Sequence, residues 1–401
     1  MKIKYSIHIF SWLGVIILFS SVLRFDAFFE DSNRYIPYRI VVLCSLIFLA
    51  ITFFRGHKFK RDTVILLVIL MAVVIFLHFF WLRSFDSAVE FINSLLSYYY
   101  VILGSVMTVY FCKYYSFDGL LSIRRYFLTL SSIIFIVETG IRFLYPELAL
   151  ADSMDPSVVK ERMVGGPSSD NFFYFKYGSI MFHDSNYVGL NAIPLLILSL
   201  VNKDRRILFS SIFSVIILFS LSRSAWIVTI LIFAIWFIRA NRFLINAMYM
   251  FGIPLSLAAI YVLYGVVSED RSFLTKVALF SALGNASDIP LTNFLFGFGY
   301  EIGSYIYSPG SSAYAHALIP LLLGEVGLVG MIVFFLSWSY LIYRFGFVVF
   351  LNFVAMFVCG LSLGDPWELI YYVVPIFSAY MFRRAKQVNM GYPDRAVAEL
   401  I

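Results

Sequence analysis

Long uninterrupted runs of apolar residues constrain this chain more than any other feature. A helix needs about 20 apolar residues to cross a hydrocarbon core of about 30 Å. Runs of this length, or slightly shorter, lie at 7–23, 37–54, 63–82, 91–112, 126–145, 186–201, 207–221, 225–238, 243–267, 317–343, 345–362 and 369–382. Of the 401 residues, 61% are hydrophobic and 13% charged, whereas soluble domains carry about 25% charged residues. The sequence therefore predicts an all-α, polytopic integral membrane protein with about twelve transmembrane helices.

Lysine and arginine gather in alternate connections between these runs. Because basic residues concentrate in cytoplasmic loops, this alternation places both termini inside the cell, with the connections near 55–62, 113–125, 203–206, 239–242 and 344. Together these segments hold 19 of the 30 basic residues but only 5 of the 24 acidic ones. The formal net charge of +6 therefore reflects orientation and contact with anionic membrane lipid, and no nucleic-acid partner is expected.

We expect one transmembrane domain over residues 1–382 and a short, disordered cytoplasmic tail over 383–401. The first apolar run resembles a signal peptide, but Leu23-Arg-Phe-Asp26 offers no small-residue cleavage site, which predicts a retained helix. Two outer connections are long, at about 146–185 and 268–315, and both are rich in turn residues. In the second, apolar residues at helical spacing from Phe273 to Leu283 predict a short helix on the membrane surface. Function is expected in these two loops.

The apolar stretch 207–238 is interrupted at Ser222-Arg-Ser224. Each half has roughly 15 residues, which is short for a full crossing, so the pattern predicts a hairpin whose tip stops within the outer half of the membrane. A charged side chain at that depth must face water, a partner or a ligand. Arg223 is therefore a candidate ligand-binding residue, and a structural ion pair is the alternative.

A few other basic residues lie on the outer side and could join Arg223. Guanidinium groups match phosphate oxygens bidentately, so several of them converging would bind a diphosphate. Pairing with a neighbouring acid is the alternative, for example with Glu161 or Asp270. The candidates are Arg162, Lys176, Arg271 and Lys276.

Two of the five histidines are expected at outer helix starts. His183 precedes Asp184, which is well placed as a helix N-cap, so this pair is also explained by helix punctuation. His316 follows a segment rich in Gly, Pro and Ser and precedes Gly324-Glu325. A histidine there can take a proton near neutral pH, although half-buried packing is the alternative. His78, inside an apolar run, is expected to be neutral, hydrogen-bonded and structural.

Two further groups are expected to be structural. Glu138 and Arg142 are four residues apart in one run and are expected to form an internal ion pair. The three cysteines lie in separate runs with no CxxC spacing, so they predict neither a metal site nor a disulfide.

The order of these motifs resembles the O-antigen polymerase and O-antigen ligase superfamily, which includes the Wzy-like bacterial polysaccharide polymerases. The resemblance covers about 140–370 and rests on a loop arginine before Gly165-Gly166, Asp-Ser-Asn-Tyr at 184–187, Ser-Arg-Ser at 222–224, Gly-Phe-Gly at 297–299, and His316 followed by Gly327 and Gly330.

The resemblance implies a membrane-embedded GT-C-like glycosyltransferase of the bacterial inner membrane, with its active site on the periplasmic face. Such an enzyme acts on glycans linked to undecaprenyl diphosphate, with inversion and with neither a metal nor another cofactor, and a chain-length regulator is a further partner. His316 would be the catalytic base and Arg223, Arg271 and Arg162 the diphosphate clamps. The remaining substrate-binding candidates are Lys176, Lys276, Asp184, Asn186, Tyr187 and Glu325.

Two alternatives stay open. A ligase would transfer the finished glycan to lipid A core, but the segment 182–189 favours a polymerase. A transporter or flippase of lipid-linked oligosaccharide is the alternative of another class. Against it, the two halves show no matching interrupted segments of the kind that inverted-repeat transporters carry.

Overall fold

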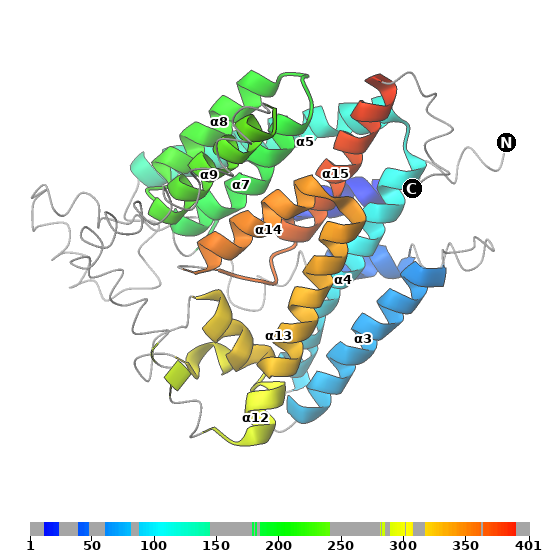
Figure 1. The fold of residues 1–401 in the computed structure, drawn as a ribbon, viewed down its shortest axis with the longest axis vertical. Coiled ribbons are helices and arrows are strands. Elements are labelled where there is room, and N and C mark those ends of the chain that lie inside the picture. Colours follow the sequence, from blue (N-terminus) through cyan, green and yellow to red (C-terminus); the bar gives the residue numbers. More distant parts are fainter. Residues whose placement is uncertain are drawn as a thin grey trace, which may run out of the picture.

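The structure, a computed structural model, is all-helical in the part of the chain that it describes. The described residues are 12–23, 39–47, 61–81, 88–144, 179, 181–182, 185–240, 281, 283–284, 289–300, 302–307, 317–361 and 364–389. Residues 12–20 and 39–47 are helical. The helices labelled in Figure 1 are α3 Arg61–Trp81, α4 Ala88–Tyr114, α5 Phe117–Leu144, α7 Ser185–Val201, α8 Arg206–Phe219, α9 Arg223–Ala240, α12 Leu291–Phe296, α13 Leu318–Phe345, α14 Phe347–Gly360 and α15 Ile370–Asn389. The 3₁₀ helix η2, Ile302–Tyr305, lies between α12 and α13 in the sequence.

The helices follow the apolar runs, and within the described residues three are long and apolar enough to cross a membrane: α4, α5 and α13. α7, α8, α14 and the segment Val68–Trp81 of α3 are apolar but shorter. The interruption predicted at 222–224 is confirmed, because α8 ends at Phe219 and α9 begins at Arg223. The run 243–267 and most of the surface helix expected at 273–283 lie outside the described residues.

α7 and α15 form the centre of the bundle. Every residue of α7 except Tyr187 is buried, as expected for a helix that is surrounded by others. α7 packs against α8, α9, α14 and α15, and α15 also contacts α4, α5, α13 and α14. The outer helices instead turn large apolar side chains outward, for example Phe79 at 70% exposed and Ile230 at 69%. Exposed apolar surface of this extent suits contact with lipid.

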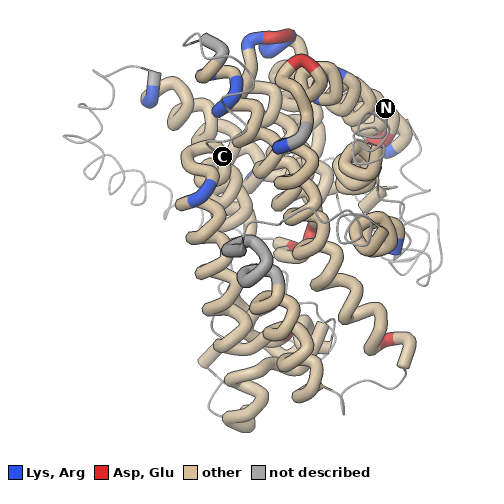
Figure 2. The backbone as a smooth tube through the Cα atoms, turned by 90° about the vertical axis from the view of Figure 1, so that its right-hand side faces the viewer, with Lys and Arg blue, Asp and Glu red and all other residues tan. Residues whose placement is uncertain are grey.

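Lys and Arg gather towards one end of the bundle, shown at the top of Figure 2. This basic end holds the C-terminal ends of α4 and α15, because Arg384 of α15 donates to the carbonyls of Cys112 and Lys113. The opposite end holds α12 (Figure 1), where Trp81 at the end of α3 donates to the Phe296 carbonyl at 2.7 Å. We call it the far end.

Buried arginines donate hydrogen bonds to the last carbonyls of neighbouring helices. One of these arginines was expected in a loop. Arg124 was expected in a cytoplasmic loop, but α5 begins at Phe117 and encloses it. Its guanidinium is fully buried and donates to the carbonyls of Leu198 (3.3 Å) and Ser199 (3.0 Å) in the last turn of α7. These carbonyls have no partner within their own helix, and a cation also complements the negative end of the helix dipole. Arg384 of α15 does the same for the last carbonyls of α4. α15 continues as a helix to Asn389, past the residue where the tail was expected to begin.

The predicted Glu138–Arg142 pair is confirmed. Arg142 Nε lies 3.2 Å from Glu138 Oε1, and both side chains are buried. Ser179 Oγ donates to the same carboxylate oxygen at 2.6 Å. Arg142 also donates to the Phe219 carbonyl at 3.1 Å, at the end of α8. The pair therefore holds the tip of the α8–α9 hairpin, which carries Arg223.

The three cysteines are free; Cys112 and Cys359 are buried and Cys44 is half-buried, as expected for packing residues.

Candidate functional site at the break in α13

α13 is broken near its N-terminal end. Gly327 has φ 67° and ψ −175°, a region of backbone space that is essentially restricted to glycine. The break leaves carbonyls without partners in their own helix. The Gly297-Phe-Gly299 segment supplies them: Phe298 N–H donates to the Gly324 carbonyl at 2.8 Å and Gly299 N–H to the Glu325 carbonyl at 3.0 Å. Two motifs singled out in the sequence therefore meet through their backbones.

A second close approach fixes η2 on α13. Gly303 and Gly324 pack so tightly that a Cβ atom on either would collide with the backbone of the other. Irregular backbone at membrane depth is tolerated where it is buried in protein or lines a polar cavity. The break in α13 is thus covered by residues 297–299 and 303, and it turns one acidic side chain of α13 into the protein.

Glu325 is the centre of this site. It is buried, with 1% of its surface exposed. Its two oxygens accept from Ser304 Oγ at 2.6 Å and from Trp367 Nε1 at 2.7 Å. The Trp367 backbone N–H donates to Asp365 Oδ1 at 3.0 Å, so one tryptophan donates to two carboxylates, from its indole and from its backbone. We call Glu325, Ser304, Asp365 and Trp367 the Glu325 cluster.

Aromatic rings surround the cluster. The Tyr98 ring stands edge-on to Trp367, with centroids 4.6 Å apart, and its centroid is 6.0 Å from that of Tyr300. His78 lies nearby, against the Trp81 ring. Its Nδ1 is 2.8 Å from the Val74 carbonyl and its Nε2 is 3.1 Å from Ser94 Oγ. Nδ1–H can only donate to a carbonyl, so His78 is placed by packing and hydrogen bonds, as predicted.

The hairpin tip packs beside the start of α7. A Cβ atom on Gly189 would meet the Ser220 hydroxyl and the Ala225 methyl group, so the segment around Arg223 lies against the first turns of α7. Tyr187 is in the first of these turns. Arg223 itself is half-buried and begins α9, which packs against α14, α7 and α8.

The start of α15 connects the first turns of α7 with Glu325. α15 packs on α7, and Tyr187 of α7 and Asp365 both lie near Tyr371. Tyr371 follows Trp367, which donates to Glu325. A row of neighbouring groups therefore runs from the hairpin tip through α7 and the start of α15 to the Glu325 cluster.

Four of the predicted site residues lie in the described part of the chain: Arg223, Asn186, Tyr187 and Glu325. Glu325 lies in the cluster and Tyr187 near the start of α15, whereas Asn186 is buried beside Tyr187 in α7 and Arg223 begins α9. Six others lie outside the described residues, namely His316, Arg162, Lys176, Arg271, Lys276 and Asp184. In sequence, His316 directly precedes Ala317, the N-cap of α13.

Sequence reasoning missed Ser304 and the segment Gly364-Asp-Pro-Trp-Glu368. A signal was present, because two acids and a tryptophan stand together in the short connection between the apolar runs 345–362 and 369–382. Glu368 is buried at the start of α15. Function was expected in the two long outer loops, whereas this short connection supplies one side of the site.

The cluster suits a ligand with many hydroxyl groups. Ionised carboxylates only accept hydrogen bonds and offer about four acceptor positions each, while tryptophan and tyrosine provide flat apolar faces with a polar edge. Among the described residues, no group of three His, Cys, Asp or Glu side chains is placed to hold a metal ion. No family model matches the chain, and no curated protein or solved structure shows significant similarity to it.

Proposed function

We propose that this protein is a membrane glycosyltransferase that polymerises oligosaccharide repeat units carried on undecaprenyl diphosphate. The observation that carries the proposal is the meeting of Gly297-Phe-Gly299 with the Gly324–Gly327 break around a buried carboxylate, in α13, the helix whose N-cap directly follows His316. The order of the motifs along the chain adds to it. On this proposal the chain has about twelve spans, the basic end faces the cytoplasm, and the far end faces the periplasm.

The proposed reaction is a single displacement. A hydroxyl oxygen of the acceptor glycan attacks the anomeric carbon of the lipid-linked donor, and the bond from that carbon to the diphosphate oxygen breaks. The diphosphate leaves with the bonding electrons, His316 takes the hydroxyl proton, and the anomeric configuration inverts. Negative charge grows on the diphosphate, so fixed cations there act most strongly in the transition state. Arg223, Arg271 and Arg162 take this role.

The Glu325 cluster takes a different role in this scheme. Its carboxylates accept hydrogen bonds from sugar hydroxyls, and the Trp367 and Tyr98 rings cover an apolar sugar face. The cluster therefore binds and orients the glycan, while the base and the clamps carry out the displacement.

Purified protein in detergent, given a lipid-linked repeat unit and no energy source, tests the proposal. We expect products with two or more repeats, resolved as a ladder by gel or mass spectrometry. His316→Ala should lower the rate by about 10²–10⁴-fold, the usual contribution of base catalysis, and His57→Ala, in a basic segment expected to be cytoplasmic, is the control.

Three outcomes would contradict the proposal. A folded His316→Ala protein with wild-type rates would remove that residue from the mechanism. Transfer to lipid A core with no repeat-unit ladder would identify a ligase. Movement of labelled lipid-linked glycan across a vesicle wall, with no longer product, would identify a transporter.

A further inference from the structure

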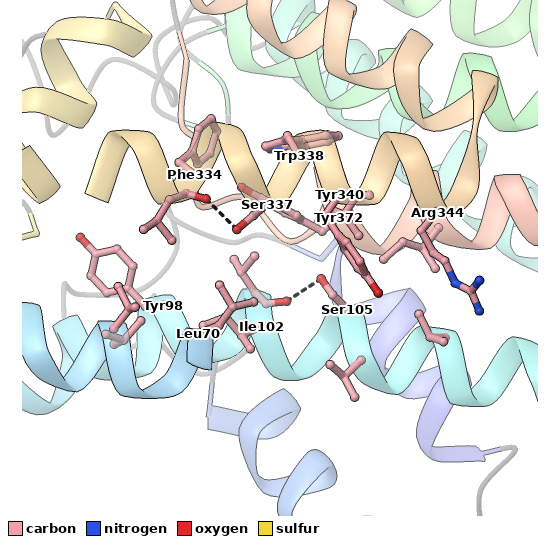
Figure 3. Close-up of a pocket in the computed structure, with 18 of the residues that line it drawn as sticks. Leu70, Tyr98, Ile102, Ser105, Phe334, Ser337, Trp338, Tyr340, Arg344 and Tyr372 are labelled. Carbon is pink, nitrogen blue, oxygen red and sulfur yellow. Dashed lines mark hydrogen bonds between the residues drawn. The ribbon is translucent and has the colours of Figure 1, made fainter. Parts of the chain in front are cut away.

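A long apolar groove runs between α3, α4, α13 and α15, and of its lining residues the proposed function uses only Tyr98 and Trp367, at one end. Its volume is about 220 Å³. Its walls are aliphatic and aromatic over most of their length, with residues such as Leu70, Ile102 and Phe334. Figure 3 shows Tyr98 at one end of the groove and Arg344 at the other.

The groove has the length and chemistry of a lipid chain. Along α4 it extends from Tyr98 to Lys113, which is about 22 Å at 1.5 Å per residue. One leaflet of hydrocarbon is about 15 Å thick, so the length of the groove exceeds the thickness of one leaflet. Two serines stand in its walls, but Ser105 donates to the Val101 carbonyl and Ser337 to the Val333 carbonyl, each at 2.7 Å, as Figure 3 shows. Their hydroxyls are thus occupied within their own helices, and the walls remain apolar.

One end of the groove is cationic. Lys113 of α4 and Arg344 of α13 both line it there. Arg383 and Arg384 stand beside them, because Arg383 donates to the Arg344 carbonyl and Arg384 to the Lys113 carbonyl. Arg384 holds α4 carbonyls, which fixes the position of these charges. The other end of the groove reaches Trp367 and Tyr98, next to the Glu325 cluster.

We propose that this groove binds an anionic phospholipid from the leaflet at the basic end. The phosphate lies on Lys113 and Arg344, and one acyl chain lies along the apolar walls towards Tyr98. Charge complementarity selects this occupant, because basic side chains near a membrane surface attract anionic headgroups. The glycan-carrying lipid of the proposed function has its diphosphate at the far end, so its headgroup does not meet this pair of cations. The inference does not depend on the proposed function.

Lipid binding can be measured without any assay of activity. The full-length protein, delipidated in detergent, is titrated with phosphatidylglycerol or with phosphatidylcholine of the same chains, and bound lipid is counted by native mass spectrometry. We expect phosphatidylglycerol to bind with clear preference. The double variant Lys113→Gln/Arg344→Gln should weaken its binding by roughly fivefold for each charge removed. Lys203→Gln/Arg205→Gln, which removes two charges outside the groove, should leave it unchanged.

A second variant tests the groove without changing its charge. Ser337→Phe places a ring in the channel and should abolish retention of the lipid. Ser210→Phe is its matched control, since Ser210 also donates to its own helix but stands on α8, away from the groove. If Lys113→Gln/Arg344→Gln fails to fold, the Ser337→Phe variant tests whether the lipid lies in the groove. Equal binding of both lipids, unaltered binding by Ser337→Phe, or displacement of phosphatidylglycerol by polyprenyl phosphate at lower concentration would each overturn the proposal.

Discussion

At the scale of single residues, neighbouring arginines in α5 have opposite roles. Arg124 is buried on the last carbonyls of α7, whereas Arg125 is exposed and pairs with Asp204 at 2.7 Å. Arg124→Met leaves buried carbonyls unsatisfied, at a cost of roughly 1–3 kcal/mol for each. Arg125→Met removes only a surface ion pair, which contributes little. We expect Arg124→Met to lower the unfolding temperature in detergent by several degrees and Arg125→Met to leave it nearly unchanged; equal shifts would contradict the capping role.

Glu325 allows the charge of the site to be removed without disrupting its packing. In Glu325→Gln, the amide oxygen can still accept from Trp367 Nε1, and the amide N–H can donate to the Ser304 hydroxyl, which reverses its own role. We therefore expect a folded protein with weaker glycan binding and a raised KM.

Trp367→Phe is the companion change, because it keeps an aromatic face but leaves the buried carboxylate with one donor fewer. It should lower the unfolding temperature more than Glu325→Gln does. Wild-type KM in a folded Glu325→Gln protein would exclude the carboxylate from glycan binding.

The residue scale also separates what sequence can predict from what it cannot. His78 and the Glu138–Arg142 pair were predicted correctly, because a histidine inside an apolar run and an i,i+4 ion pair depend on local sequence. Arg124 was misplaced, since its burial depends on carbonyls of a helix about 75 residues away in the chain. A basic residue near a helix end looks the same in sequence whether it faces water or caps a neighbour.

At the scale of elements, the break in α13 makes a sharp prediction. Gly327→Ala places a side chain in a conformation that costs roughly 1–3 kcal/mol, and its Cβ would also collide with the backbone of Leu295 and Gly297. Gly346→Ala is a matched control, because Gly346 has φ 80° but open space around its Cβ position. Thermal unfolding should show the larger loss for Gly327→Ala, accompanied by loss of turnover. Equal losses would mean that strain alone acts and that contact with 295–297 contributes nothing.

The positions of the helices could be predicted from the sequence, but which segments pack against each other could not. Apolar runs located the helices and the hairpin break, since burial in lipid or protein requires continuous apolar surface. The sequence also marked Gly297, Gly299 and Gly327 as irregular backbone. That 297–299 would satisfy the carbonyls exposed by the break in α13 depends on a contact between distant segments. Ser304 and Trp367 escaped notice for the same reason, because each becomes part of the site only when its segment packs on α13.

At the scale of the whole molecule, the separation of charge predicts orientation. Residues 203–206 lie at the basic end, because Asp204 pairs with Arg125 in the early part of α5, which follows α4 directly. Leu291, at 70% exposed, begins α12 at the far end. If basic residues mark the cytoplasm, a membrane-impermeant maleimide should label Leu291→Cys in cells whose inner membrane is intact. It should label Lys203→Cys only after permeabilisation. Cys44, Cys112 and Cys359 are replaced by alanine for this experiment. Labelling of both positions in intact cells would contradict the proposed topology. Labelling of Lys203→Cys alone in intact cells would invert it, and would leave the Glu325 cluster facing the wrong compartment for a periplasmic transferase.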